Sequence, residues 1–148
     1  MTRLFSLDNK TAVVTGALGL IGRRHCEALA AHGANVIVAD LDAAACADFA
    51  ATLPTPAFGC PLDVTDPASI AALRDAALGR FGHLDVLVNN AAINDMFESP
   101  AMAADQSRFE NYPLAMWQKS LEVNVTGVFL CAQILGAPMA AQGQGSII

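Results

Sequence analysis

Residues 11–22 read TAVVTGALGLIG, an apolar, β-branched run that leads into a turn with three glycines. A run of this kind is typical of a buried strand. Gly16, Gly19 and Gly22 allow a tight turn, the close approach of a pyrophosphate and close packing of a following helix. The N-terminus of that helix would offer free N–H groups to an anion. The stretch therefore predicts a phosphate-binding turn, although a plain strand-to-helix turn would look the same.

Strand-like and helix-like segments alternate along the rest of the chain. Further strands are expected at NVIVAD (35–40), AFGCPLD (57–63), LDVLVNN (84–90) and, just beginning, SII (146–148). One of the intervening helices is delimited by Asp66 as its N-cap, Pro67 in its first turn and Gly82 at its end. A single long helix is expected over residues 113–143.

This alternation predicts an α/β fold of the Rossmann type, a doubly wound parallel sheet with strand order 3-2-1-4-5. A length of 148 residues suits one domain, here a dinucleotide-binding domain over residues 1–148. The sequence reaches only the first residues of the fifth strand, so we expect the sheet to be truncated there. Ligands bind such sheets at the carboxyl ends of the strands, where the strand order switches between strands 1 and 4.

Composition argues against several classes of protein. The chain is 54% hydrophobic and carries a net charge of −6 without a run of Lys or Arg, so nucleic acid is not an expected partner. The four cysteines form no CxxC pair, which favours buried thiols in a reducing compartment rather than a metal site. The apolar stretch 128–141 is interrupted by Gln133 and Pro138 and is expected to fall short of a membrane span. With no apolar signal core at the N-terminus, we expect a cytoplasmic protein.

Carboxylates follow the second and third expected strands. Asp40 lies eighteen residues after Gly22, where a carboxylate can accept from both ribose hydroxyls of an adenosine and repel a 2′-phosphate. Asp63 could accept from an adenine amino group. Asp40 could instead cap the next helix, and Asp63 could be an ordinary turn carboxylate. Asp42 and Asp66, however, are available as the caps of the two following helices.

Small residues follow the fourth strand. Asn90, Ala91 and Ala92 leave room for a flat ring or a ribose, although an Asn-rich turn would read the same. The coincidence of all these features at strand ends favours a nucleotide site with NAD as the cofactor. The predicted cofactor-binding residues are Gly16, Gly19, Leu20, Ile21, Gly22, Asp40, Leu41, Asp63, Val64, Asn90, Ala91 and Ala92.

The pieces TGALGLIG, VIVADLD, LDV, LDVLVNNAA and LEVNVTGVF together resemble the N-terminal part of a short-chain dehydrogenase/reductase, over nearly the whole chain. The classical branch of that family has a TGxxxGxG turn. Here Gly19 and Leu20 give TGxxGxxG instead, the spacing of the extended, sugar-nucleotide branch. The NNAA run and the later Val-Asn-Val are similar to the classical branch, with Ala92 in place of its usual glycine. The resemblance is therefore to the classical branch with an unusual turn.

Asn124 stands within the expected long helix, where Asn, Val, Thr and Gly127 are poor choices for an interior position. A buried Asn bonded to its own helix would account for it. The resemblance implies instead a catalytic role, in which Asn124 holds a local helix distortion and a water of the proton relay.

The resemblance implies hydride transfer assisted by a serine, a tyrosine and a lysine four residues after the tyrosine. Here the one tyrosine, Tyr112, is followed at that distance by Met116, and Ser146 precedes the fifth apolar run. We therefore expect an NAD-dependent oxidoreductase of alcohols or carbonyls whose residues 1–148 are inactive alone. Alternatives are a non-catalytic dinucleotide-binding or assembly module and a sugar-nucleotide epimerase or dehydratase.

Two expectations concern partners. The resemblance implies a homo-oligomer formed through the long helix, where Met116, Leu121, Phe129 and Leu130 supply apolar surface. The polar loop over residues 93–113 would favour a small hydroxylated substrate.

Overall fold

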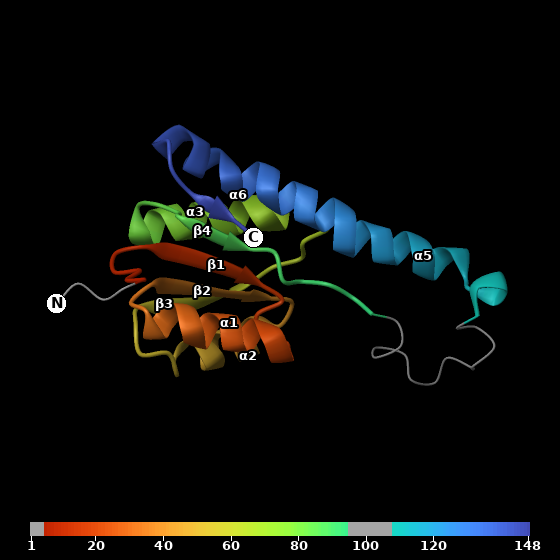
Figure 1. The fold of residues 1–148 in the computed structure, drawn as a ribbon, viewed down its shortest axis with the longest axis horizontal. Coiled ribbons are helices and arrows are strands. Elements are labelled where there is room, and N and C mark those ends of the chain that lie inside the picture. The colour runs from red at the N-terminus through yellow and green to blue at the C-terminus, as the bar shows by residue number, and fades with distance from the viewer. Residues whose placement is uncertain (1–4, 95–107) are drawn as a thin grey trace.

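The computed structural model describes residues 5–94 and 108–148, which form one parallel sheet with helices on both faces (Figure 1). The strands pair in the order β3-β2-β1-β4-β5, and every pair is parallel. Their bounds are Thr11–Thr15 (β1), Asn35–Asp40 (β2), Ala57–Pro61 (β3), Val86–Val88 (β4) and Ser146–Ile147 (β5). The predicted Rossmann-type sheet and its strand order are confirmed.

Helices cover both faces of this sheet. They are α1 (Leu20–Ala31), α2 (Ala43–Ala50), α3 (Pro67–Phe81), α5 (Leu114–Leu121) and α6 (Val128–Gln142), with a 3-10 turn η1 (Phe109–Asn111) and a π-helical turn η2 (Glu122–Gly127). Figure 1 shows α1 and α2 on one side of the strands and α3 and α6 on the other. In the same view α5 extends beyond the sheet as an arm.

The central strands are buried on both faces because alternate side chains enter two separate cores. Val13 and Ile37 pack with α3 and α6, whereas their neighbours Val14 and Val38 pack with α1 and α2. Every residue of β1 is buried. The turn that follows β1 is therefore anchored to a fully buried strand at the centre of the sheet.

Helix caps occur at the predicted carboxylates. Asp42 accepts a hydrogen bond from the N–H of Ala45 at the start of α2, at 3.0 Å. Asp66 caps α3 by accepting from the N–H of Ala68 at 2.9 Å, and Gly82 ends that helix at a φ of 79°. Because these residues serve the helices, Asp40 is not needed as a cap.

The long helix predicted over residues 113–143 is a continuous helical segment from Leu114 to Gln142, and the π-helical turn η2 divides it into α5 and α6. Its 29 residues, with an 18-residue window of mean hydropathy 1.5, would suffice for a membrane span by length and composition alone, as some core helices of soluble proteins also would. The stretch 128–141, which was expected to fall short of a span, is only the C-terminal part of this helix, and length and composition alone do not make the whole helix a membrane span. Within the fold, α6 packs into the core through Cys131, Leu135 and Met139.

Candidate functional site

The turn after β1 is built by contacts between backbone atoms. Gly16 has a φ of +61°, and a Cβ at this position would lie 2.8 Å from the Cα of Ala91. A Cβ on Gly22 would lie 2.2 Å from the carbonyl oxygen of Gly16. Since both distances are far below van der Waals contact, glycine is required at these two positions before any ligand is considered.

The N-terminus of α1 opens from this turn. The first N–H groups of a helix have no partner within it, and the residue before α1 is Gly19, which has no side chain to cap them. Leu20 and Ile21 begin the helix and turn apolar side chains outward, 91% and 65% exposed. The turn can therefore hold an anion through its backbone and the helix dipole alone.

Asp40 is held beside the same turn by two backbone N–H groups. Its Oδ2 accepts from Leu18 at 2.9 Å, and its Oδ1 accepts from Leu41 at 2.8 Å. A carboxylate oxygen can accept more than one hydrogen bond, so each oxygen keeps capacity for a ligand hydroxyl. The end of β2 thus presents a negative charge in a fixed orientation next to the glycine turn.

Asp63 follows β3 and is fixed by Thr65. The backbone N–H and the hydroxyl of Thr65 both donate to Oδ1 of Asp63, at 2.9 and 2.7 Å. These bonds, led by the one from the hydroxyl, lower the pKa of Asp63. Asp63 is therefore a turn carboxylate, as the plainer explanation held. It is also an ionised hydrogen-bond acceptor at the end of β3, so it can still bind a ligand.

Asn90 links the end of β4 to the glycine turn. Its side-chain amide donates to the carbonyl oxygens of Thr15 and Gly16, at 2.9 and 3.0 Å. In return, the Thr15 hydroxyl accepts from the backbone N–H groups of Asn90 and Ala91, each at 3.0 Å. The role of Asn90 in this structure is to fix the two strand ends relative to each other, with Thr15 as a partner that sequence reasoning missed.

Asn124 lies in the π-helical turn η2. Its Oδ1 accepts from the N–H of Ile93 at 2.8 Å, and its Nδ2 donates to the carbonyl of Ile93 at 3.0 Å. The alternative of an Asn bonded to its own helix is therefore wrong. The predicted helix distortion is present, and π-helical turns often occur at functional sites. Asn124 ties the distorted helix to the segment after β4.

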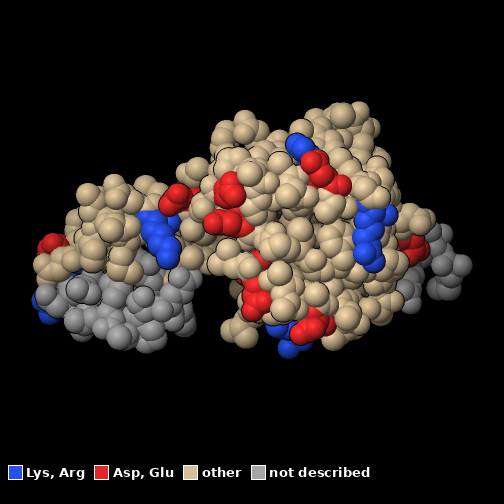
Figure 2. Space-filling view, turned by 180° about the vertical axis from the view of Figure 1, so that it is seen from behind, with Lys and Arg blue, Asp and Glu red and all other residues tan. Residues whose placement is uncertain are grey.

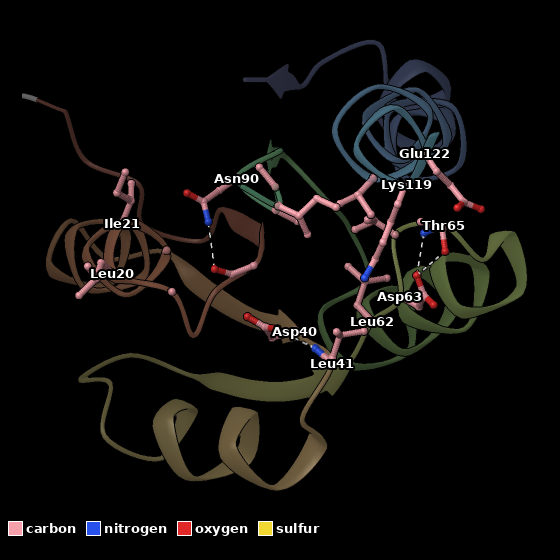
Figure 3. A pocket seen from close by; sticks show the side chains of 18 residues that line it. Leu20, Ile21, Asp40, Leu41, Leu62, Asp63, Thr65, Asn90, Lys119 and Glu122 are labelled. Atoms are coloured by element: carbon pink, nitrogen blue, oxygen red, sulfur yellow. Dashed lines mark hydrogen bonds between the residues drawn. The ribbon is translucent and has the colours of Figure 1, made fainter. Parts of the chain in front are cut away.

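These strand ends and the helix border one cleft of about 880 Å³. Figure 2 shows, from behind, the hollow between the lobe that carries α5 and the body of the molecule. Figure 3 shows the lining residues from close by. Every residue predicted to bind the cofactor lines this cleft, whereas Asn124 does not and Val123 beside it does.

Sequence reasoning missed one wall of the cleft. The additional lining residues are Leu62, Thr65, Ile93, Lys119, Glu122 and Val123. The last three come from α5 and η2, far along the chain from the strand ends. Only the packing of the long helix brings them there, and local sequence carries no signal for it.

Three other expectations concern the cysteines, a metal site and the polar loop. The four cysteines are buried and unpaired, and burial raises the pKa of Cys26 to about 12. Within residues 5–94 and 108–148 no group of three or more His, Cys, Asp or Glu could hold a metal ion. Most of the polar loop expected to favour a hydroxylated substrate, residues 95–107, lies outside the described residues.

The chain has clear relatives among known proteins. The sequence profile of the short chain dehydrogenase family matches residues 10–148. A 3-alpha-(or 20-beta)-hydroxysteroid dehydrogenase of Mycobacterium tuberculosis is 39% identical over 142 residues, which are 96% of this chain and 51% of the relative. A D-threitol dehydrogenase of Mycolicibacterium smegmatis is 36% identical over 97% of this chain and 53% of its own length. The chain thus spans about half the length of the curated relatives it matches.

A solved structure agrees with these relatives. The crystal structure of a short-chain type dehydrogenase/reductase from Mycobacterium marinum superimposes with a TM-score of 0.83 at 35% identity, covering 97% of this chain and 56% of that one. The profile match over almost the whole sequence and the shared fold together establish the family. The chain belongs to the short-chain dehydrogenase family of oxidoreductases.

Proposed function

We propose that the chain forms the cofactor-binding part of an NAD-dependent oxidoreductase that acts on an alcohol or carbonyl group of a small molecule. The observation that supports this best is the single cleft in which the open end of α1, Asp40 and Asp63 meet. They come from three different strand ends, in the order in which diphosphate, ribose and adenine follow one another in a dinucleotide. Bound NAD would supply or accept the hydride.

The residues of the cleft fit such a ligand. The uncapped N–H groups of α1 suit a diphosphate, and the absence of a Cβ on Gly16 and Gly22 keeps the turn closed beneath it. Asp40 would accept from the adenosine ribose, and Asp63 with Val64 would border the adenine. Leu20, Ile21 and Leu41 would give apolar contact, and Asn90, Ala91 and Ala92 would border the second ribose.

NAD is the expected form of the cofactor because of Asp40. A 2′-phosphate on the adenosine ribose would stand beside a carboxylate that two backbone N–H groups hold in place. Repulsion between like charges at contact distance is worth about 1–4 kcal/mol, so NADH should bind at least about fivefold more tightly than NADPH.

Fluorescence titration of the purified protein with NADH and NADPH tests this proposal. The Asp40→Ala variant should narrow the preference for NADH. Tighter binding of NADPH by the native protein, or a wider preference in the variant, would overturn the assignment of Asp40.

Substrate and catalysis rest on the family. Relatives that match this chain are named as dehydrogenases of hydroxysteroids, D-threitol and galactitol, which supports a secondary alcohol or its ketone as the substrate. Asn124 would hold the water of the proton relay from its place in η2. Residues 1–148 contain no tyrosine with a lysine four residues later, since Tyr112 is followed there by Met116.

A protein made of residues 1–148 and nothing more should therefore bind NADH but not turn it over, because loss of positioned acid–base groups costs about 10²–10⁴-fold in rate. An NADH-oxidation assay with polyols and ketones, run beside an intact mass measurement, tests this expectation. Turnover that survives repurification of a molecule of that mass would refute it. We further propose a cytoplasmic homo-oligomer for the protein that carries this chain.

A further inference from the structure

We propose that Lys119 closes the adenosine end of the cleft, with its methylene chain against the adenine ring and its ammonium group over the bound nucleotide. This proposal rests on the proposed function, because it needs a dinucleotide in the cleft. It assigns an affinity-determining role to a residue on α5, outside every strand end and the glycine turn.

The position of the side chain is the first observation. Lys119 lines the cleft together with Leu41 and Leu62, although it comes from a different layer of the fold. Figure 3 shows its side chain running from the helix into the cleft, with the ammonium end directed toward Leu41 and Leu62. An exposed lysine on an arm could extend into solvent, and this one instead points across the opening.

The charge of the cleft is the second observation. Among the lining residues within 5–94 and 108–148, the charged side chains are three carboxylates, Asp40, Asp63 and Glu122, and one ammonium, Lys119. A dinucleotide carries a negatively charged diphosphate, so three of these four charges oppose its entry. Among the residues that the structure describes, Lys119 is then the one lining side chain that favours it, since the turn at α1 contributes only backbone dipoles.

The ammonium of Lys119 is also available. In the part of the chain that the structure describes, the ion pairs are Lys10–Asp85, Arg24–Glu27, Arg74–Asp75 and His83–Asp85, so no described carboxylate lies within ion-pair distance of Lys119. Glu122 lies three residues further along the helix and is not paired with it either. A cation without a described partner at the mouth of an acidic cleft suits an anionic ligand.

The apolar surroundings decide which part of the ligand Lys119 meets. Leu41 is 74% exposed at the end of β2, and Leu62 follows β3. Leu62 is only 3% exposed, so a flat base at this end would rest mainly on Leu41 and would have its other face toward α5. A lysine stem is apolar enough to cover that face, and an ammonium over an aromatic ring is attracted by it. The adenine, rather than the nicotinamide, is therefore the expected contact.

Calorimetry with two ligands and four variants tests this role on the purified protein that carries residues 1–148. The ligands are NAD and ADP-ribose, which has the adenosine and diphosphate but lacks the nicotinamide. Lys119→Ala should weaken both by the same factor, about 5–30-fold, from a loss of stem and charge together. Lys119→Met keeps most of the apolar stem but removes the charge. It should therefore lose less affinity than Lys119→Ala, and its binding should depend less on salt concentration than that of the wild type.

Two variants serve as controls. Gln118→Ala shortens the exposed neighbour of Lys119 on the same helix, and Gln118 does not line the cleft. Arg24→Met changes the net charge as Lys119→Met does, but removes a surface residue paired with Glu27. Both should bind NAD and ADP-ribose as the wild type does. Thermal melts check that each variant is folded. If Lys119→Ala is unfolded, the comparison of Lys119→Met with the wild type tests the proposal instead.

The outcomes separate the two proposals. Wild-type protein that binds neither ligand refutes the proposed function and this role with it. If the wild type binds and both Lys119 variants stay within about twofold of it, Lys119 has no part in affinity and only this proposal fails. A loss for NAD without a loss for ADP-ribose would place Lys119 at the nicotinamide end and would overturn the adenine contact.

Discussion

Replacing Gly22 by alanine tests the turn at the start of α1 most directly. The added Cβ would lie 2.2 Å from the Gly16 oxygen and 2.8 Å from the Cα of Ala17, whereas ordinary contacts begin at 3.4 Å. The Gly16 carbonyl would have to move by about 1.2 Å. It cannot move freely, because it accepts hydrogen bonds from the N–H of Gly19 at 3.2 Å and from Asn90 at 3.0 Å.

Two measurable losses follow. Overpacking of this kind costs about 1–3 kcal/mol of the free energy of unfolding. Moving the turn also displaces the N–H groups that would bind the diphosphate, and hydrogen bonds to charged groups are worth about 1.5–3 kcal/mol each. One such bond lost would weaken NAD binding by about 10–150-fold. Urea unfolding measures the first loss, and calorimetry with NAD measures the second.

Two other glycines provide matched controls. Gly19 has a φ of −67°, and a Cβ there would meet the Gly16 oxygen at 3.4 Å, so Gly19→Ala should leave the fold intact. A Cβ on Gly79 in α3 would meet nothing within 4 Å, so Gly79→Ala should stabilise the helix by up to about 1 kcal/mol. The reasoning fails if Gly22→Ala binds NAD as tightly as the wild type does. It also fails if Gly79→Ala lowers the free energy of unfolding as much as Gly22→Ala does.

Three further predictions concern other parts of the molecule. Buried thiols such as Cys26, whose pKa burial raises to about 12, should resist alkylation at about pH 8 until the protein is unfolded, which peptide mass spectrometry can follow. Thr65→Val removes the hydroxyl whose hydrogen bond is the main cause of the lowered pKa of Asp63, so that pKa should rise in an NMR titration. NAD binding should then be lost at a higher pH than in the wild type as the solution is acidified; an unchanged acid limit would show that the Asp63 carboxylate is not required. Leu121 and Phe129 are 40% and 60% exposed on the long helix, so Phe129→Glu should reduce self-association in light scattering, and a wild type that is monomeric at high concentration would contradict the proposed oligomer.

The features that sequence could predict are those set by neighbours along the chain. Asp42 and Asp66 cap helices because the N–H groups that they satisfy lie two or three residues away. The strand ends could be aligned because parallel strands place their carboxyl ends at the same edge of the sheet. That rule is sufficient to bring the glycine turn, Asp40 and Asp63 to one cleft without knowledge of any side-chain contact.

The features that sequence could not predict depend on how the long helix crosses the sheet. Lys119 and Glu122 reach the cleft only because α5 continues through η2 into α6, which is fixed to the core by Cys131 and Leu135. The hydrophobic pattern of a helix predicts which of its residues are buried. It does not predict which strand end α5 will lie over. Nor did it predict that Asn124 would turn away from its own helix to bond Ile93.

The unusual spacing of the glycine turn has a physical explanation in the structure. TGxxGxxG and TGxxxGxG share their first and last glycines, here Gly16 and Gly22, and these are the two positions where a Cβ would collide with backbone. The two positions between them that differ are Gly19 and Leu20. Leu20 begins α1 with its side chain 91% exposed, so it does not strain the turn. The spacing alone therefore does not favour a sugar-nucleotide enzyme over a dehydrogenase. What Leu20 changes is the surface beside the helix N-terminus, which becomes apolar where a glycine would leave the backbone bare.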